Sequence, residues 1–132
     1  MRYMLDTNIC SYILKKHPLM VKVRFDQLGL GALALSTVVL AELYYGAARH
    51  AQRLTIRGEI DDFASRLTVI AWDESAADHY GVIRAALERS GTSIGAMDMM
   101  IAAHARSIGA TLVSNNTRHF KRIPELLLAD WV

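Results

Sequence analysis

The sequence has little cysteine and no apolar run long enough to cross a membrane. Cys10 is the only cysteine, which excludes an intramolecular disulfide and a cysteine-rich zinc site and favours a reducing compartment. The longest uncharged stretch, residues 27–41, is shorter than the roughly 18 apolar residues of a membrane helix. Asp6, Thr7 and Asn8 interrupt the order of basic, apolar and small residues that a secretion signal needs. We therefore expect a cytoplasmic protein without a membrane span.

Repeats, low-complexity segments and flexible linkers are also missing. The chain has 132 residues, of which 52% are hydrophobic, enough for one sizeable core and too few for two. We expect a single domain over residues 1–132. Its charge is uneven, because residues 1–57 carry eight Lys and Arg against three acids and residues 58–82 carry one against six. This distribution permits a basic face for a polyanion such as RNA.

Short apolar runs alternate with segments of helical spacing. Strands are expected at residues 3–5, 33–35, 69–71 and 111–113, with a tail from Leu126 that is compatible with a fifth. Helices are expected near residues 7–14, 18–28, 39–49, 52–67, 75–90 and 96–107. In the second helix, Leu19 and Val23 are predicted to face inward, and Phe25 is compatible with the same face. The alternation predicts an α/β three-layer sandwich with a mainly parallel, short-stranded sheet flanked by helices.

Three carboxylates stand alone in apolar surroundings. Asp6, Glu42 and Asp98 are each the only formal charge in a stretch of at least 12 residues. An ionised carboxylate taken out of water is costly unless something pairs with it. Asp6 directly follows the first expected strand, and in a parallel sheet ligands bind beyond the carboxyl ends of the strands. The three acids are therefore candidates for one shared site.

Each acid also has a purely structural explanation. Asp6 and Asp98 could be helix N-caps, and Glu42 could lie on a solvated helix face with Arg49 one heptad later. Capping does not explain why all three lack charged neighbours. Carboxylate oxygens suit Mg²⁺ or Mn²⁺, which lower the pKa of a bound water and neutralise a leaving oxygen. The residues thus favour metal-dependent phosphodiester hydrolysis.

Four stretches together resemble PIN-domain ribonucleases of the VapC type, the toxins of toxin–antitoxin pairs. They are MLDTN at 4–8, STVVLAELYYG at 36–46, IGAMDMMIAAHA at 94–105 and LVSNNTRHF at 112–120. Their order, spacing and total length match the family over essentially the whole chain. The resemblance implies a PIN-like fold and a Mg²⁺-dependent endoribonuclease, with Mn²⁺ as an alternative ion.

The resemblance also assigns residues. It implies that Asp6, Glu42 and Asp98 are the catalytic, metal-binding acids, and that the polar groups around them are Thr7, Asn8, Ser114 and Asn115. Many relatives have Asp where this chain has Asn116, whose amide offers a carbonyl oxygen without charge, so a second metal is expected to be held less firmly. His119 lies where acids are also common. A phosphate contact, a proton transfer and a plain surface position all stay open for it.

Partners follow from the same resemblance. It implies a cognate VapB-type antitoxin that covers the site, a toxin homodimer, and a structured RNA substrate. The candidate substrate is the anticodon loop of initiator tRNA, where unpaired nucleotides can enter a cleft. The alternative is a catalytically weak or inactive PIN-like module that binds RNA or acts as a scaffold, supported by the missing acid at Asn116.

Two other enzyme or signalling classes fit less well. Haloacid-dehalogenase-type phosphatases need a second Asp two residues after the first, where this chain has Asn8. Response-regulator receivers need an acidic pair after the first strand and a Lys after the last one. Neither signal is present.

Overall fold

A sheet of five parallel strands forms the centre of the computed structural model, which describes residues 2–132. The strand order is β3-β2-β1-β4-β5, and all four neighbouring pairs are parallel. The strands are β1 (Tyr3–Leu5), β2 (Leu33–Ser36), β3 (Thr68–Ile70), β4 (Thr111–Val113) and β5 (Leu127–Ala129). The predicted α/β class is confirmed, and the tail does form a fifth strand.

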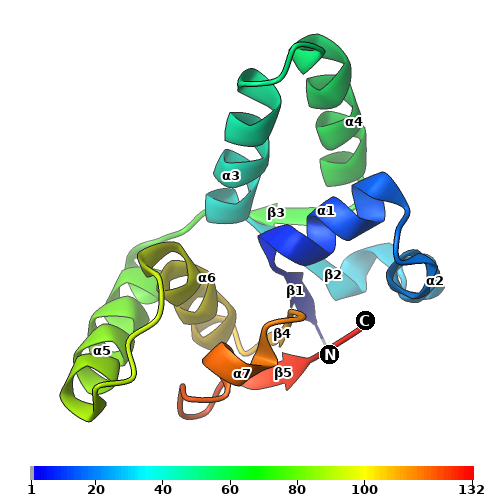
Figure 1. Cartoon of the computed structure of the whole chain (residues 1–132). Coiled ribbons are helices and arrows are strands. Elements are labelled where there is room, and N and C mark those ends of the chain that lie inside the picture. The colour runs from blue at the N-terminus through cyan, green and yellow to red at the C-terminus, as the bar shows by residue number, and fades with distance from the viewer. Residues whose placement is uncertain (1) are drawn as a thin grey trace.

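Helices connect the strands and flank the sheet (Figure 1). They are α1 (Thr7–Lys15), α2 (Leu19–Gln27), the 3₁₀ turn η1 (Leu30–Ala32), α3 (Thr37–Ala48), α4 (Arg53–Ser65), α5 (Glu74–Ser90), α6 (Ala96–Ser107) and α7 (Thr117–Phe120). The sequence predicted α1 to α6 within a few residues. It did not predict η1 or α7, because elements of three or four residues are too short to show a hydrophobic period. No helix within residues 2–132 is long and apolar enough to cross a membrane.

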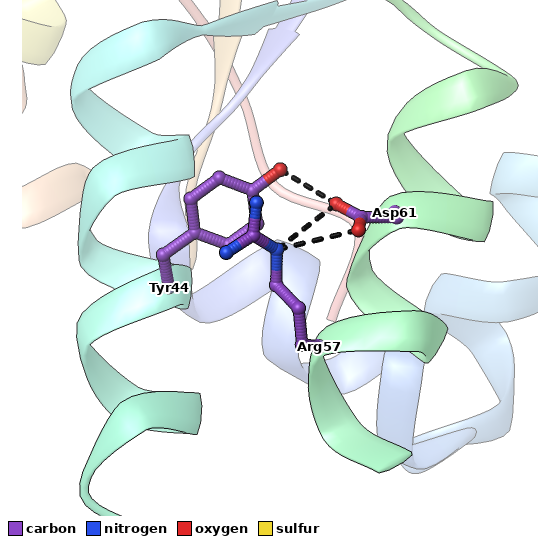
Figure 2. A network of polar contacts seen from close by, with 3 residues as sticks. All are labelled: Tyr44, Arg57 and Asp61. Atoms are coloured by element: carbon purple, nitrogen blue, oxygen red, sulfur yellow. Dashed lines mark hydrogen bonds and ion pairs between the residues drawn. The ribbon is translucent and has the colours of Figure 1, made fainter. Parts of the chain in front are cut away.

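The helices form two pairs on different sides of the sheet. In Figure 1, α3 and α4 project together from the sheet as a hairpin, and α5 packs along α6 on another side. The hairpin is joined by a network of Tyr44, Arg57 and Asp61 (Figure 2). These two pairs carry Glu42 on α3 and Asp98 on α6 into the region around the central strands.

The core lies around the central strands, where β2 and β4 are buried along their whole length. A parallel strand covered by helices on both faces has no solvent side, so its sequence reads as a continuous apolar run. The outer strands differ, since Val69 on β3 is 42% exposed and Leu127 on β5 is 53% exposed. The ends of the central strands therefore rest on the buried core of the fold.

The inward face predicted for α2 is wrong for Leu19 and Val23, whereas Phe25, which was compatible with it, is buried. Val21 and Phe25 are buried, whereas Leu19 is 66% exposed and Val23 is 39% exposed. Both pairs have the i, i+4 spacing that places residues on one helix face, so periodicity alone could not choose between them. Tertiary packing decides, because Phe25 stacks on Phe63 of α4 with the ring centroids 5.6 Å apart.

Candidate active site at the switch point of the sheet

The carboxyl ends of β1 and β4 lie side by side at the point where the strand order reverses. The chain passes from β1 to β2 on one side, and β4 pairs with β1 on the other side. This reversal of direction is the switch point where doubly wound sheets bind their ligands. Asp6 follows β1 and Ser114 follows β4, and the Asp6 backbone N–H donates to the Val113 carbonyl over 3.1 Å. The carboxyl ends of β1 and β4 are therefore in register.

Asp6 is both a helix cap and a member of an acidic cluster. Its Oδ1 accepts a hydrogen bond of 2.9 Å from the Ile9 backbone N–H, so the capping explanation is confirmed for this residue. Burial raises the pKa of Asp6, the charges of Asp98 and Glu42 raise it further, and hydrogen bonds with Ser114 and Ile9 oppose them. A carboxylate has two oxygens with about four acceptor sites, so capping leaves capacity for a cation.

Glu42 reaches the end of β1 through Thr7. The Thr7 hydroxyl donates to Glu42 Oε1 over 2.8 Å, across 35 residues of sequence. Glu42 is half-buried, and Arg49 lies over the Tyr45 ring, 5.4 Å from its centroid. Glu42 and Arg49 nevertheless line the same cavity, so the solvated face suggested for these two residues is compatible with the structure. The expected supporting place of Thr7 beside the acids is observed.

Asp98 lies in the first turn of α6, whose N-cap is Gly95, so Asp98 is not itself the cap. The positive end of the helix dipole favours a carboxylate there. Burial raises the pKa of Asp98, and the charge of His119 opposes that rise. His119 is therefore close enough to Asp98 to affect its pKa, and a role for His119 in the site stays a prediction.

The segment after β4 arranges the remaining polar groups. Ser114 is buried, and its hydroxyl accepts from the Asn116 backbone N–H over 2.9 Å. Asn116 Nδ2 and His119 Nδ1 lie 3.0 Å apart. Asn115 Nδ2 donates to the Tyr12 hydroxyl over 2.8 Å. These contacts hold residues 114–119 together and connect them to α1.

Two of the predicted supporting residues lie farther from the acids than the sequence suggested. Asn8 is exposed on α1, and the Asn115 amide points to Tyr12, which the sequence did not single out. Asn115 and Tyr12 are 103 residues apart, and a contact of that separation leaves no local pattern. Ser114, Asn116 and His119 remain beside the cluster by the contacts above.

The donors fit a hard divalent cation. Carboxylate and hydroxyl oxygens are the ligands that Mg²⁺ and Mn²⁺ prefer. Across residues 2–132, ion pairs form elsewhere and none of them involves Asp6, Glu42 or Asp98. Within that part of the chain, no three His, Cys, Asp or Glu side chains already surround one point closely enough to hold a metal. None of the three acids is neutralised by an ion pair in the described residues, and holding an ion between them would take side-chain movement.

A cavity of about 450 Å³ opens beside Glu42, between α1, α3 and α4. Thr7 also lines it, together with Lys15, Arg49 and His50, whereas Asp6 and Asp98 do not. A larger hollow of about 730 Å³ lies between α1, α2 and α4, and none of the three acids lines it. The smaller cavity is therefore the one of these two that contacts an acid of the candidate site.

Comparisons with known proteins agree with this arrangement. A sequence profile of the family described as PIN domain matches residues 3–126. The chain is 45% identical over 132 residues to Ribonuclease VapC2 of Haemophilus influenzae, covering 100% of this chain and 99% of that protein. It is 44% identical over 131 residues to the tRNA(fMet)-specific endonuclease VapC of Shigella flexneri, covering 99% of this chain and 98% of the relative.

Solved structures give the same result. The DNA-bound VapBC of Salmonella typhimurium contains a chain that superposes with a TM-score of 0.94 at 40% identity, covering 100% of this chain and 99% of that one. The chain belongs to the PIN-domain family and, within it, to the VapC ribonucleases. The predicted family, fold and nuclease class are confirmed. Nucleases with this domain generally depend on a divalent metal ion.

Proposed function

We propose that this chain is the toxin of a toxin–antitoxin pair, a Mg²⁺- or Mn²⁺-dependent endoribonuclease that hydrolyses a phosphodiester bond in a structured RNA. The observations that support the proposal are the charges of Asp98 and Glu42, which raise the pKa of Asp6, and the Thr7–Glu42 hydrogen bond, which connects α3 to the end of β1. The three acids come from separate segments of the chain, and none of them forms an ion pair within residues 2–132. A bound cation would relieve the repulsion between these like charges.

Each residue has a stated part in this proposal. Asp6 and Asp98 would hold the ion directly, and Glu42 would join them by turning from Thr7, whose hydroxyl keeps it close. When bound, a divalent ion would activate water for attack on the phosphodiester and offset the charge that develops on the leaving oxygen. Ser114 orients Asp6, and His119, held by Asn116, would contact phosphate or transfer a proton near Asp98.

The partners are proposed from the relatives. The Salmonella typhimurium structure is of a VapBC complex on DNA, and the Shigella flexneri relative is named for tRNA(fMet). We propose a VapB-type antitoxin, a toxin homodimer and initiator tRNA as the candidate substrate for this chain, acting in the cytoplasm. Purified protein should then cut initiator tRNA in its anticodon loop and leave elongator methionine tRNA intact. Sequencing the RNA ends made on induction tests the substrate without prior choice.

One observation favours the alternative of a weak or inactive RNA-binding module. Asn116 contributes no negative charge, and its side chain is engaged with His119. Such a module would bind RNA and cut nothing, with or without metal. The two functions are therefore separated by a cleavage assay.

The test of the proposal is Asp98→Asn, which removes a ligand charge at constant volume. Cleavage should fall at least about 100-fold, because loss of a ligand costs more than loss of an outer partner, which already costs about 10–100-fold. The matched control is Asp78→Asn, an exposed acid on α5. Circular dichroism and melting temperature check that both variants fold.

The same assay tests the metal and the nucleophile. Activity should vanish in chelator, return with Mg²⁺ or Mn²⁺, and not return with Ca²⁺, whose longer and looser coordination spoils in-line attack. Products should carry a 5′-phosphate because water is the nucleophile. Full activity of Asp98→Asn, or a 2′,3′-cyclic phosphate product, would overturn the proposal.

A further inference from the structure

A buried histidine–serine pair joins α6 to the start of α3, behind the acids. His104 Nδ1 and Ser36 Oγ lie 2.8 Å apart across 68 residues of sequence, and both residues are 0% exposed. The Ser36 hydroxyl also accepts from the Val38 backbone N–H over 3.1 Å, so it caps α3 at the same time. Neither residue reaches the surface, so neither can touch RNA.

The pair is unusual because the chain leaves half of the imidazole without a partner. His104 Nε2 is buried and has no hydrogen-bond partner within the described residues. An apolar side chain of similar size would fill this place without an orphaned polar atom. The hydrogen bond at Nδ1 is therefore the feature that distinguishes histidine from a core residue such as leucine.

The charge and hydrogen placement of the pair follow from the same contacts. Burial lowers the pKa of His104, against an opposing effect of Asp73, so the imidazole is neutral at neutral pH. Ser36 Oγ already accepts a hydrogen bond from the Val38 backbone N–H. The fewest polar groups are left without a partner if the Ser36 O–H donates to His104 Nδ1, so we assign the bond this direction. The hydrogen bond between His104 and Ser36 therefore forms with a neutral imidazole and is present at neutral pH.

The position of the pair relates it to the acids. Ser36 lies six residues before Glu42, and His104 lies six residues after Asp98. Trp72 adds a parallel connection between the same helices, because its backbone N–H donates to Thr37 Oγ1 over 3.1 Å and its indole N–H donates to the Met100 carbonyl over 3.0 Å. The two acid-bearing helices are thus fixed to each other from their buried side.

We propose that His104 is a positioning residue, whose hydrogen bond to Ser36 sets the spacing between Asp98 on α6 and Glu42 on α3 and thereby sets the affinity of the site for a divalent metal. The proposal rests on the proposed function, in which these acids bind the ion. A metal site is sensitive to the placement of its ligands, and partners beyond the ligands typically change metal affinity about 10–100-fold.

The experiment measures Mn²⁺ binding to the full chain without RNA, from the EPR signal of free Mn²⁺. His104→Leu keeps the volume and removes the bond, and it should weaken Mn²⁺ binding about 10-fold or more. His104→Asn places an amide near the position of Nδ1, and it should restore most of the affinity. Ser36→Ala should weaken binding as His104→Leu does, and the double variant should be no worse than either single one.

A matched control separates positioning from general stability. Ile101→Val trims a buried residue on the same helix without touching the link, so it should lower the melting temperature and leave Mn²⁺ affinity unchanged. Cleavage by His104→Leu should recover at saturating Mn²⁺, because the defect is in occupancy. If His104→Leu does not fold, Ser36→Ala and His104→Asn carry the comparison.

The outcomes distinguish the two proposals. Wild-type affinity in a folded His104→Leu or Ser36→Ala, or an equal loss in Ile101→Val, overturns the positioning role and leaves the proposed function standing. Absence of Mn²⁺ binding to the wild type, or equal binding to Asp98→Asn, overturns the metal site itself and the positioning role with it.

Discussion

Two aspartates of this chain show opposite ways of holding a negative charge. Asp61 on α4 accepts from the Tyr44 hydroxyl over 2.6 Å and from Arg57 Nε over 3.3 Å to each carboxylate oxygen (Figure 2). The Tyr44 hydrogen bond, with help from Arg57, holds the pKa of Asp61 below its usual range. Asp6 has no such cation, and burial together with two neighbouring acids raises its pKa.

The difference separates a structural acid from a candidate functional one. The Asp61 network also places the Arg57 guanidinium 3.5 Å from the Tyr44 ring centroid, so the charge of Asp61 is matched by a cation of the chain. The charges of Asp98 and Glu42 raise the pKa of Asp6, and none of these three acids forms an ion pair within residues 2–132. A perturbed pKa with an unmet charge at a switch point is what a ligand site requires. Residue type alone would not have told these aspartates apart.

The largest effect is expected from adding a negative charge to the candidate site. Asn116→Asp places a fourth carboxylate beside His119, so the Mg²⁺ concentration for half-maximal cleavage should fall by up to about 10-fold. A Mg²⁺ titration on one RNA measures it, and Gln27→Glu, which adds the same charge at the end of α2, should leave the midpoint unchanged. His119→Ala in the same titration shows whether the imidazole compensates for the missing acid. An unmoved midpoint in Asn116→Asp would place residue 116 outside the reach of the metal.

Much of this fold could be predicted from the sequence because its signals are local. The strands are short apolar runs, and Asp6 and Ser36 are ordinary N-cap residues ahead of helical periods. The isolation of the three acids also reads directly from the chain. The exposed face of α2 could not be read, because its two candidate faces have the same spacing and Phe63, far along the chain, selects one.

The parts of the site that sequence reasoning missed depend on long-range contacts. The Thr7–Glu42 bond spans 35 residues, and the His104–Ser36 bond spans 68. Neither has a periodic or motif signature, since each partner alone is common in helices and caps. The sequence therefore indicated which residues to propose for the chemistry, and the structure was needed to show their long-range hydrogen-bond partners.

A smaller effect should appear when the unmatched charge is removed. Asp6→Asn keeps the volume and still caps α1, and it should raise the melting temperature in chelator at pH 7 by a few degrees. The folded-state pKa of Asp6 is raised above the ordinary 3.8, so the native form binds this proton more tightly than the unfolded chain does. Stability from this group is present at low pH and is lost as the pH rises through the folded pKa.

The measurement is thermal unfolding by circular dichroism across pH, with and without Mn²⁺. The advantage of Asp6→Asn should shrink as the pH falls toward 4. Added Mn²⁺ should stabilise the wild type and not the variant, because only the wild type retains the ligand. A variant that melts lower than the wild type in chelator at pH 7 would contradict the view that Asp6 carries an uncompensated charge.

The smallest effect is expected at the matched acid. Asp61→Asn keeps an acceptor for the Tyr44 hydroxyl and loses the ionic attraction to Arg57, an exposed pair of the kind that contributes little. The melting temperature should fall slightly at pH 7, and the fall should shrink in 1 M salt. Asp62→Asn, which removes an exposed pair at 3.6 Å with Arg66, is the control for simple charge loss and should have still less effect.

The pH dependence of the two variants distinguishes the two kinds of acid. The folded-state pKa of Asp61 is lowered from 3.8, so its stabilisation is complete above that pH and is lost as the pH falls through the lowered value. The cost of Asp61→Asn should therefore be present at pH 7 and disappear as the pH falls below about 4, whereas the gain of Asp6→Asn should develop as the pH rises above about 4. Differences of the same sign, or changes confined to the same pH range, would show that the chain treats these two charges alike. Opposite signs at pH 7, with the two changes on opposite sides of the ordinary pKa, would show that Asp6 carries a charge that the described residues leave uncompensated.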